Sequence, residues 1–356
     1  MNLIKALRIL LVVAGLATLL GVGVSAAQAA PVGGLKQFRV PTPASDPKYI
    51  TQGSDGNLWF TESDNEGPPN GENVLTPHNI GRITPDDEIT EFPACFREPP
   101  IPPDESPFGF CFPNDIVQGP DNVLYFTKSE ENLGRMSTAT GELLPNVDTP
   151  FGPGAIARDG SDLWLTDFGD ASIWRYDTSS SVDEFAQFQI PPAPPTPSNP
   201  TPIAPNPSDV AVAADGTVWF TDSFNNRIGS LNPSTRTFDM VSVPGNPYKI
   251  TIATNGTVWY IGRFDTTIGR LDPANGQVTE FPISRGPHDD IAAAPDGSVW
   301  FTQFGVGNVA RIDQDGTITE GRKVKGSGPF GITVASNGDP WYTMFRANRI
   351  ATLQLR

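Results

Sequence analysis

His288 is the residue of this sequence best suited to acid–base chemistry, because an imidazole changes its charge near neutral pH. It is one of only two histidines, and two acids, Asp289 and Asp290, follow it directly. This arrangement predicts a general acid or base, although a histidine alone at a protein surface is the commoner case. The other histidine, His78, is interpreted as an ordinary surface residue.

Carboxylate and amide side chains recur at two points of a repeated pattern, one near a Pro-x opening and one at the end of an aromatic-x-Thr run. Mg²⁺ and Ca²⁺ prefer such oxygen ligands, so a divalent cation is predicted. The candidate ligands are Asn114, Asp115, Asp209 and Asp222. A repeated acid at a strand end is also often only a solvated cap. That alternative stays open for Glu62, Asp167 and Asp222.

These side chains belong to a unit that occurs seven times. Successive units lie about 40 residues apart, except where two insertions lengthen the interval. Asp-Gly and Asn-Gly pairs, such as Asp215-Gly216, separate short apolar runs and predict two-residue hairpin turns. The aromatic marker of the unit is found at Trp59, Tyr125, Trp164, Trp219, Trp259, Trp300 and Trp341.

Each unit has four short β-like runs. Four-stranded units repeated around a ring predict an all-β protein, a seven-bladed β-propeller with one unit per blade. The last unit ends at 348–356, a segment that supplies its third strand and no fourth. The segment 35–40 is similar to the fourth strands at 89–92 and 278–281. We therefore expect this N-terminal strand to complete the last blade and close the ring, which removes two exposed sheet edges.

In a propeller, the inner strand of each blade starts at one face of the central channel, and the hairpin returns the second strand to that face. The residue after each opening proline and the residue at each second-strand end are therefore predicted to ring one channel mouth. Their spacing is constant in five units, one residue shorter in the third and one longer in the sixth. The predicted mouth residues are Lys48, Glu62, Asn114, Lys128, Gly154, Asp167, Ser208, Asp222, Tyr248, Gly262, His288, Gln303, Phe330 and Met344, with Asp115, Asp209, Asp289 and Asp290 beside them.

Two other repeated side chains are predicted to be structural. The marker tryptophan is expected to pack between blades. An arginine recurs on the third strand, away from the channel, and is expected to pair between blades. These arginines are Arg82, Arg135, Arg175, Arg270 and Arg311.

Residues 1–29 have the pattern of a secretory signal peptide. Lys5 and Arg8 precede an apolar stretch at 9–24, and Ala27-Gln28-Ala29 forms a small-residue cleavage site. An uncleaved anchor is the alternative, because the apolar stretch approaches the length that spans a bilayer. Residues 30–356 are predicted to form a single propeller domain with insertions near 63–77, 94–112 and 191–207.

The two cysteines, Cys95 and Cys111, flank a Pro-rich loop. In an exported chain they predict a disulfide, which stabilises by about 3 kcal/mol for a loop of this size. The formal net charge of −16 disfavours nucleic acid and anionic membranes as partners. We expect a secreted, periplasmic or cell-surface monomer that binds a small molecule, a peptide or a protein.

Three segments of the first unit carry a family resemblance. They read Asp-Gly-Asn-Leu-Trp-Phe-Thr-Glu at 55–62, Asn-Ile-Gly-Arg-Ile at 79–83 and Ile-Thr-Glu-Phe-Pro at 89–93. In these motifs the chain resembles the virginiamycin B lyase (streptogramin lyase) family, and the similarity extends from residue 30 to the end apart from two insertions. The resemblance implies a β-propeller and a Mg²⁺-assisted elimination that opens the ester bond of a cyclic depsipeptide without hydrolysis.

The catalytic set implied by this resemblance is a mouth His on one blade and Glu-x-His with a strand-end Glu on the next. If His288 is the first His, the next blade offers Gly328, Phe330 and Met344. If it is the second, the remaining positions hold Tyr248, Gly286 and Gln303. Gln303 offers one neutral oxygen, and a site without both carboxylates is expected to bind Mg²⁺ poorly.

Two functions are compatible with these residues. The missing ligands favour a non-catalytic exported propeller that binds a ligand or a protein at its mouth or at its inserted loops. The alternative is a divalent-metal-dependent lyase, or a lactonase-like hydrolase, that opens a cyclic ester with His288 and nearby acids. The chain also resembles propellers of the gluconolactonase and regucalcin type, which hold a divalent metal at the channel mouth through Glu, Asn and Asp. That resemblance implies a metal site formed by Asn114, Asp115 and Asp209.

Overall fold

The computed structural model describes residues 33–62, 78–95, 111–128, 132–195, 201–283 and 288–355. The predicted signal peptide at 1–29 and the insertion at 63–77 lie outside these ranges, as do most of 94–112 and part of 191–207. The chain from Pro31 to Arg356 forms one compact unit. Within the described ranges, no helix is long and apolar enough to cross a membrane.

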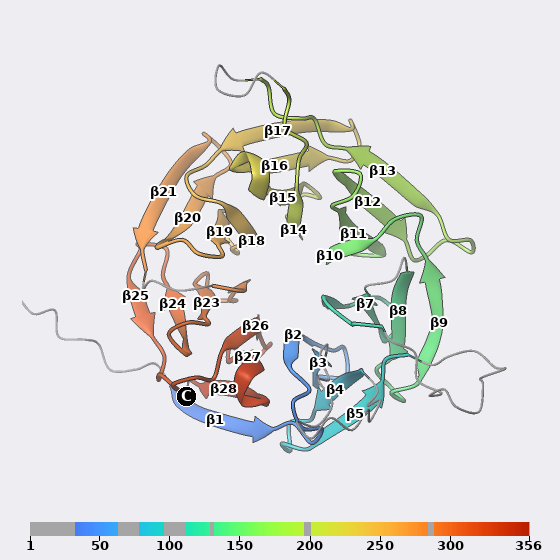
Figure 1. Ribbon diagram of the computed structural model, residues 1–356, viewed down its shortest axis with the longest axis vertical. Coiled ribbons are helices and arrows are strands. Elements are labelled where there is room, and N and C mark those ends of the chain that lie inside the picture. The colour runs from blue at the N-terminus through green and yellow to red at the C-terminus, as the bar shows by residue number, and fades with distance from the viewer. Residues whose placement is uncertain are drawn as a thin grey trace, which may run out of the picture. The chain divides into compact units, whose positions relative to one another are not determined.

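Seven antiparallel four-stranded sheets stand around a central axis, which confirms the predicted seven-bladed β-propeller (Figure 1). Blades 1 to 4 consist of β2 (Pro47–Gln52), β3 (Leu58–Glu62), β4 (Asn79–Ile83) and β5 (Ile89–Pro93); β6 (Ile116–Gln118), β7 (Val123–Thr127), β8 (Asn132–Ser137) and β9 (Leu143–Asp148); β10 (Pro153–Asp159), β11 (Asp162–Asp167), β12 (Ser172–Asp177) and β13 (Phe185–Gln189); and β14 (Pro207–Val212), β15 (Val218–Asp222), β16 (Arg227–Asn232) and β17 (Thr237–Ser242).

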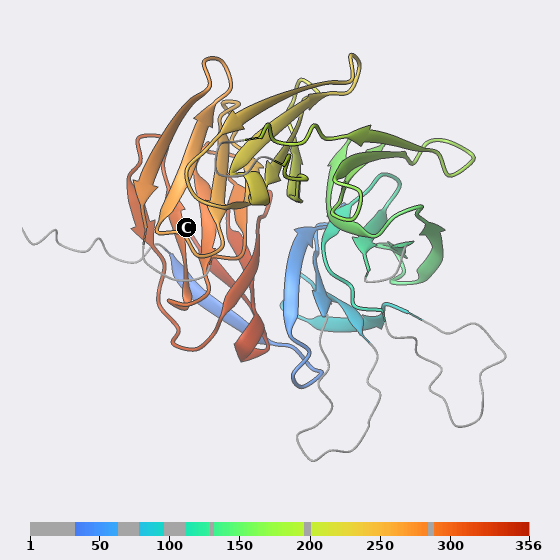
Figure 2. The same ribbon diagram turned by 45° about the horizontal axis from the view of Figure 1, so that its top comes forward.

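Blades 5 to 7 consist of β18 (Pro247–Ile252), β19 (Val258–Gly262), β20 (Thr267–Asp272) and β21 (Gln277–Pro282); β22 (Ile291–Ala293), β23 (Val299–Gln303), β24 (Asn308–Ile312) and β25 (Ile318–Glu320); and β26 (Pro329–Val334), β27 (Pro340–Met344), β28 (Arg349–Gln354) and β1 (Gly34–Arg39). Two single-turn 3₁₀ helices, η1 (Ser223–Asn225) and η2 (Phe345–Ala347), are the helices of the described ranges. The first strand of each blade borders the axis and the fourth forms the rim (Figures 1 and 2).

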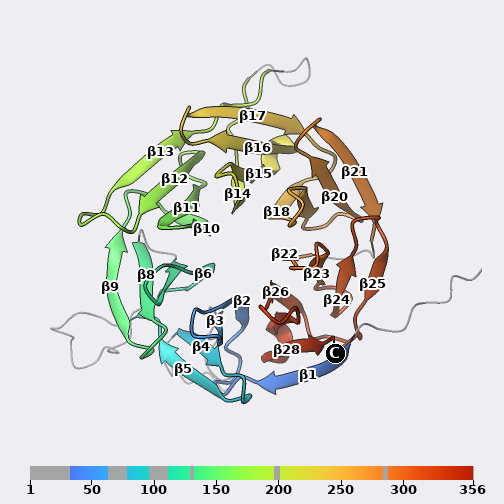
Figure 3. The same cartoon turned by 180° about the vertical axis from the view of Figure 1, so that it is seen from behind.

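The N-terminal strand closes the ring as predicted. β1 pairs antiparallel with β28, in a register that runs from Gly34 opposite Gln354 to Arg39 opposite Arg349. Figure 3 shows the two strands side by side at the rim of the last blade. The side chain of Asn348 reinforces this contact, because its Nδ2 donates to the Thr42 carbonyl oxygen at 2.7 Å. Blade 7 therefore has four strands like the others.

The hairpin turns follow from the Asp-Gly and Asn-Gly pairs. Gly216, with φ of 82°, takes the left-handed conformation that the turn requires and that glycine adopts without strain. The preceding Asp215 accepts a hydrogen bond from the Thr217 amide at 2.9 Å, which fixes the turn. These turns lie at the ends of the inner strands, on the face opposite the channel mouth.

Apolar side chains are buried between neighbouring blades. Trp259 of blade 5 packs with Ile291 and Phe301 of blade 6, so the predicted packing of the marker tryptophan between blades is confirmed. The predicted disulfide is also confirmed, since Cys95 and Cys111 are bonded and buried between blades 1 and 2. The central channel is thereby framed by rigid inner strands.

Candidate functional site

A pocket of about 180 Å³ opens at the channel mouth among the inner strands of blades 1 to 5. It brings together five residues predicted from the sequence, Asn114, Asp115, Gly154, Ser208 and Tyr248. Two of the lining residues outside the predicted set stand at equivalent positions. They are Tyr49 and Lys249, and each directly follows the residue after an opening proline.

Three equivalent carboxylates on alternate blades link the inner strands to one another. Each accepts a hydrogen bond from a backbone amide of the next blade. The pairs are Ile156 N to Asp115 Oδ2 at 3.1 Å, Ile250 N to Asp209 Oδ2 at 2.9 Å and Ile332 N to Asp290 Oδ2 at 2.9 Å. These acids therefore help to hold neighbouring blades together.

Lys249 occupies the same position on blade 5 and supplies the positive charge of this cluster. Its Nζ lies 3.3 Å from Asp209 Oδ1 and 4.3 Å from the centre of the Tyr49 ring. Lys249, Asp209 and Tyr49 are all buried. The floor of the mouth pocket is thus an internally paired group of charges.

Burial shifts the protonation of this floor. It raises the pKa of Asp290 to about 7 and that of Asp209 to about 6, although the charge of Lys249 lowers both. Burial lowers the pKa of Lys249, but the attraction of Asp209 and its neighbours outweighs this effect and raises that pKa well above its ordinary value. Lys249 is therefore charged near neutral pH, and Asp290 titrates in the same range.

An aromatic collar surrounds the mouth. In blades 3 to 7 a phenylalanine follows the end of the second strand by one or two residues, so all five lie on the mouth face. Phe168 and Phe224 are each 60% exposed, and their ring centres are 6.2 Å apart. The collar is defined here as Phe168, Phe224, Phe264, Phe304 and Phe345.

The collar continues into the pocket. The Phe345 ring stacks on Phe330 at 5.7 Å, and Phe330 meets Tyr49 edge-on at 5.4 Å. On the other side, the guanidinium of Arg263 lies 5.4 Å from the centre of the Tyr248 ring. The recurrence of Phe after the second strands of blades 3 to 7 is visible in the sequence, but it lies outside the predicted mouth residues.

The family model of the virginiamycin B lyase family matches residues 25–197 and 198–356. The chain belongs to this family. A streptogramin B lyase structure is 22% identical, with a TM-score of 0.73 over 91% of this chain and 98% of that one. The virginiamycin B lyase of Staphylococcus aureus is 21% identical, with a TM-score of 0.71 over 91% of this chain and 99% of that one.

A structure with lower sequence identity comes from a different class of protein. The extracellular domain of a hybrid two-component system from B. thetaiotaomicron is 13% identical, with a TM-score of 0.67 over 92% of this chain and 42% of that one. At these identities, the likeness to all three structures shows the fold alone. A search of curated proteins finds no match to this chain.

The metal expected of a virginiamycin B lyase family member does not fit the three candidate carboxylates, Asp115, Asp209 and Asp222, as they are arranged. Both carboxylate oxygens of Asp115 accept backbone amides, at 2.9 Å from Ile116 and 3.1 Å from Ile156. Asp209 is held by the Lys249 ammonium, which occupies the space that a cation needs. Among the described residues, no three His, Cys, Asp or Glu side chains are grouped to hold a metal ion.

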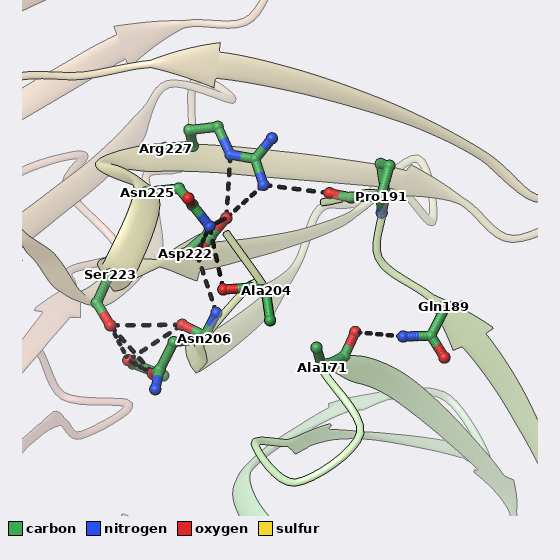
Figure 4. Close-up of polar contacts among 10 residues, drawn as sticks. Ala171, Gln189, Pro191, Ala204, Asn206, Asp222, Ser223, Asn225 and Arg227 are labelled. Carbon is green, nitrogen blue, oxygen red and sulfur yellow. Dashed lines mark hydrogen bonds and ion pairs between the residues drawn. The ribbon is translucent and has the colours of Figure 1, made fainter. Parts of the chain in front are cut away.

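Asp222, the third of these carboxylates, is fully buried, and Figure 4 shows it beside Arg227 and Asn225. Its Oδ2 lies 2.6 Å from Arg227 Nη2, and its Oδ1 accepts the Asn206 amide at 2.9 Å. Arg227 also donates to the Pro191 carbonyl oxygen at 3.2 Å. Asp222 therefore fastens both ends of the Pro-rich insertion to blade 4.

The other strand-end residues are likewise turned away from the pocket. Asp167 accepts hydrogen bonds from the Gly169 amide at 2.9 Å and from Trp174 Nε1 at 3.3 Å. Glu62 is buried beside Asn79, and burial raises its pKa well above the usual range. Gln303 is buried too, and its Oε1 has no hydrogen-bond partner in the described part of the chain.

The strand register explains why these residues miss the pocket. In blades 1, 3, 4, 5 and 7 the residue opposite the strand-end residue is the opening proline, as in Pro47 opposite Glu62 and Pro207 opposite Asp222. The register then shifts, so an extra residue is accommodated before regular pairing resumes. The predicted pairing with the residue after the proline is therefore displaced by one residue, and the pocket is lined by residues that follow the prolines and by none of the strand-end residues.

His288, the candidate acid–base residue, is fully buried. Its Nδ1 lies 3.1 Å from the Thr302 carbonyl oxygen. The Asp290 amide donates to Thr302 Oγ1 as the Asp209 amide donates to Thr221 Oγ1. His288 thus takes the place of an opening proline.

The remaining predicted residues border the mouth without forming a catalytic group. Asp289 is buried and lies 3.2 Å from Arg263 Nε. The carbonyl oxygen of Lys48 accepts a hydrogen bond from Thr343 Oγ1 at 2.6 Å, which joins blade 1 to blade 7. His78, predicted at the surface, is buried with its ring centre 4.6 Å from that of Phe112.

Proposed function

We propose that this member of the virginiamycin B lyase family is a ligand-binding propeller, and that its mouth takes a peptide-like ligand with aromatic side chains. The observation that carries the proposal is the aromatic collar, in which Phe168, Phe224 and Phe264 are exposed, beside a pocket whose charged floor is already paired. Aromatic rings provide large contact areas and stack on one another with a defined geometry.

The polar groups of the pocket suit recognition of amides. Asn114, Ser208 and Tyr248 offer neutral donors and acceptors at the wall. Lys249 is committed to Asp209, and His288 is buried against the Thr302 carbonyl oxygen. The neutral wall residues therefore support orientation of a bound ligand. Lys249 and His288 are already engaged, which does not favour transfer of protons to or from the ligand.

We also propose that the protein acts outside the cytoplasm. The Cys95–Cys111 disulfide supports this, because disulfides persist in oxidising compartments. The leader-like pattern at 1–29 agrees with export. The partner is expected to be a small molecule or a peptide at the mouth.

A second candidate function is a divalent-metal-dependent lyase, or lactonase-like hydrolase, that opens a cyclic ester. Membership of the virginiamycin B lyase family favours it. Mg²⁺ or Ca²⁺ would then require either displacement of Lys249 from Asp209 or a set of ligands other than the four candidates.

Calorimetric titration with a cyclic depsipeptide of the streptogramin B class separates the two candidates. We expect binding that is unchanged by EDTA or added Mg²⁺, with the depsipeptide recovered intact by chromatography and mass spectrometry. Ring opening that requires Mg²⁺ would instead establish the lyase. If neither the depsipeptide nor short aromatic peptides bind, the proposed function is wrong.

A further inference from the structure

A second and larger cavity lies between blades 4 and 5, at the face opposite the channel mouth. Its volume is about 870 Å³, and it reaches the hairpin turns at 215–216 and 255–256. Blade 4 contributes Trp219, Ser230 and Asp239, and blade 5 contributes Ile252 and Leu271. The proposed function makes no use of this cavity.

The cavity coincides with a missing arginine. In blades 1, 2, 3, 5 and 6, the third-strand residue opposite the aromatic marker is an arginine. These residues are Arg82, Arg135, Arg175, Arg270 and Arg311. In blade 4 the residue opposite Trp219 is Ser230. Blade 7 has Thr352 at this position, and there Phe38 stacks on Trp341 at 5.7 Å.

Blade 5 shows what the arginine does. The Arg270 guanidinium lies 5.5 Å from the centre of the Trp259 ring and 5.3 Å from that of Phe281. A guanidinium at this distance from aromatic faces is stabilised by cation–π attraction. Arg82 of blade 1 lies at 5.5 Å from Trp59 in the same way. In each of these two blades, an arginine guanidinium therefore lies between aromatic rings of its own blade.

Blade 4 lacks the covering ring as well as the cation. Phe281 stands opposite Ile268, whereas the residue opposite Ile228 is Val241. Trp219 is accordingly 8% exposed, against 0% for Trp259. The indole of blade 4 is therefore accessible from the cavity.

The counter-charge of the missing arginine is still present. In blade 6, Arg311 Nη2 lies 3.1 Å from Asp296, the acid of the hairpin turn. The turn acid of blade 4, Asp215, lines the cavity together with Asp239, and the lining contains neither Lys nor Arg. Hydrogen bonds from Thr217 lower the pKa of Asp215, so this carboxylate is ionised.

The cavity between blades 3 and 4 provides an internal comparison. There Arg175 is present, lies 3.7 Å from Asp162, and lines a cavity of about 300 Å³. Asp215 lines this smaller cavity as well, on the side away from Asp239. Loss of the arginine thus coincides with the larger space, an indole that is 8% exposed and a lining whose charged side chains are both acids.

We propose that this cavity binds the guanidinium group of a ligand, which stacks on Trp219 and pairs with Asp215 and Asp239 in place of the arginine that blade 4 lacks. The group can belong to a small guanidine or to an arginine side chain of a peptide. Both sources present the same planar cation.

Titration of the purified protein with N-acetyl-L-arginine amide tests this site. N-acetyl-L-citrulline amide is the neutral isosteric control. We expect one arginine-amide site per chain and binding of the citrulline probe that is weaker by about tenfold or more. A pentapeptide with a central arginine that binds more tightly than the amide identifies a peptide as the source; equal binding identifies a small guanidine.

Ser230→Arg restores the residue found in five other blades. It is expected to abolish binding of the arginine probe while the melting temperature stays the same or rises. Ser336→Arg adds the same charge at an exposed position of blade 7 and is expected to leave binding unchanged. Asp239→Asn is a second variant that does not depend on the folding of Ser230→Arg. It changes an exposed side chain of the cavity and is expected to weaken binding of the arginine probe several-fold.

Equal binding of the two probes, or arginine binding that persists in both Ser230→Arg and Asp239→Asn, would overturn the proposal. Depsipeptide binding at the mouth is expected to be unaffected by Ser230→Arg. The guanidinium site and the mouth site are therefore tested by separate measurements.

Discussion

Two carboxylates near the channel, the buried Asp222 and the half-buried Asp290, are stabilised in different ways. Asp222 pairs with the guanidinium of Arg227 at 2.6 Å. Asp290 has backbone amide donors, and burial raises its pKa to about 7. The first is therefore a structural ion pair, and the second is a group that titrates near neutral pH.

Replacement of Asp222 tests its structural role. Asp222→Ala leaves the buried Arg227 without its partner, so the free energy of unfolding is expected to fall by about 3–5 kcal/mol. Urea denaturation measures this loss. Asp313→Ala breaks the exposed pair with Arg311, at 2.7 Å, and is expected to cost about 0–1 kcal/mol. Equal losses in the two variants would contradict the assignment.

Asp290 predicts a pH dependence of stability. Its pKa is raised from 3.8 to about 7, so the folded chain holds a proton that the unfolded chain releases. Stability from this group is complete below about pH 4 and is lost as the pH rises to about 7. Asp209, with a pKa raised to about 6, acts in the same direction. The charged and titratable groups that face Asp290 are Lys249, Asp115, Asp209 and Tyr49.

Asp290→Asn is therefore expected to reduce the decline of the unfolding free energy between about pH 5 and 7. One such group contributes a slope of at most about 1.4 kcal/mol per pH unit. Urea denaturation at several pH values gives the slope. Asp315→Asn is the control, because Asp315 has a lowered pKa and titrates below this range. A slope that is identical in wild type and Asp290→Asn would exclude this role.

At the scale of the strands, the sequence predicts the blades well and the site poorly. Four β-like runs with Asp-Gly turns recur, so the sheets and their order follow directly. The register shift after each opening proline has no comparable sequence signal, and it displaces the pairing of Glu62 and Asp222 by one residue. The extra residue before Ile291 similarly puts His288 in a buried position.

Other site residues needed three-dimensional information. Lys249 is one residue beyond a predicted mouth position, and nothing local shows that its ammonium meets Asp209 of the preceding blade. The collar is an exception. Its phenylalanines recur at a nearly fixed distance after the second strand, so comparison of the units alone would have found them.

The collar carries the mouth-binding prediction. Phe168→Ala and Phe224→Ala are each expected to weaken depsipeptide binding by roughly two- to tenfold, the effect of losing one aromatic contact. The melting temperature should change little because both rings are 60% exposed. Calorimetry and thermal melting give both quantities. Val182→Ala removes an exposed apolar side chain outside the collar and should alter neither the affinity nor the melting temperature. Unchanged depsipeptide binding in both Phe variants would show that the collar is not part of the site.

At the scale of the whole molecule, every blade packs its buried side chains against its two neighbours. Inner strands are joined through Asp115, Asp209 and Asp290, and through the contact of Thr343 with Lys48. The ring is closed by β1, which comes from the opposite end of the described chain. The stability of the mouth therefore depends on a strand that contributes no residue to it.

Phe38→Ala tests this closure. Phe38 of β1 stacks on Trp341 and lies under the ammonium of Lys36, 5.2 Å from its ring centre. Because Phe38 is only partly buried, its loss is expected to cost about 1–3 kcal/mol, less than the 3–5 kcal/mol typical of a fully buried ring. The last blade should open first, since loss of the β1 contact exposes the edge of β28.

Hydrogen exchange distinguishes this local opening from uniform destabilisation. In Phe38→Ala, the amides of β28 are expected to exchange faster at low denaturant while those of β16, on the far side of the ring, keep their protection. Phe224→Ala removes a ring of the same type that no strand pairing depends on, and should leave β28 protected. If β28 and β16 lose protection together in Phe38→Ala, the ring opens as one unit and β1 is not its weakest closure.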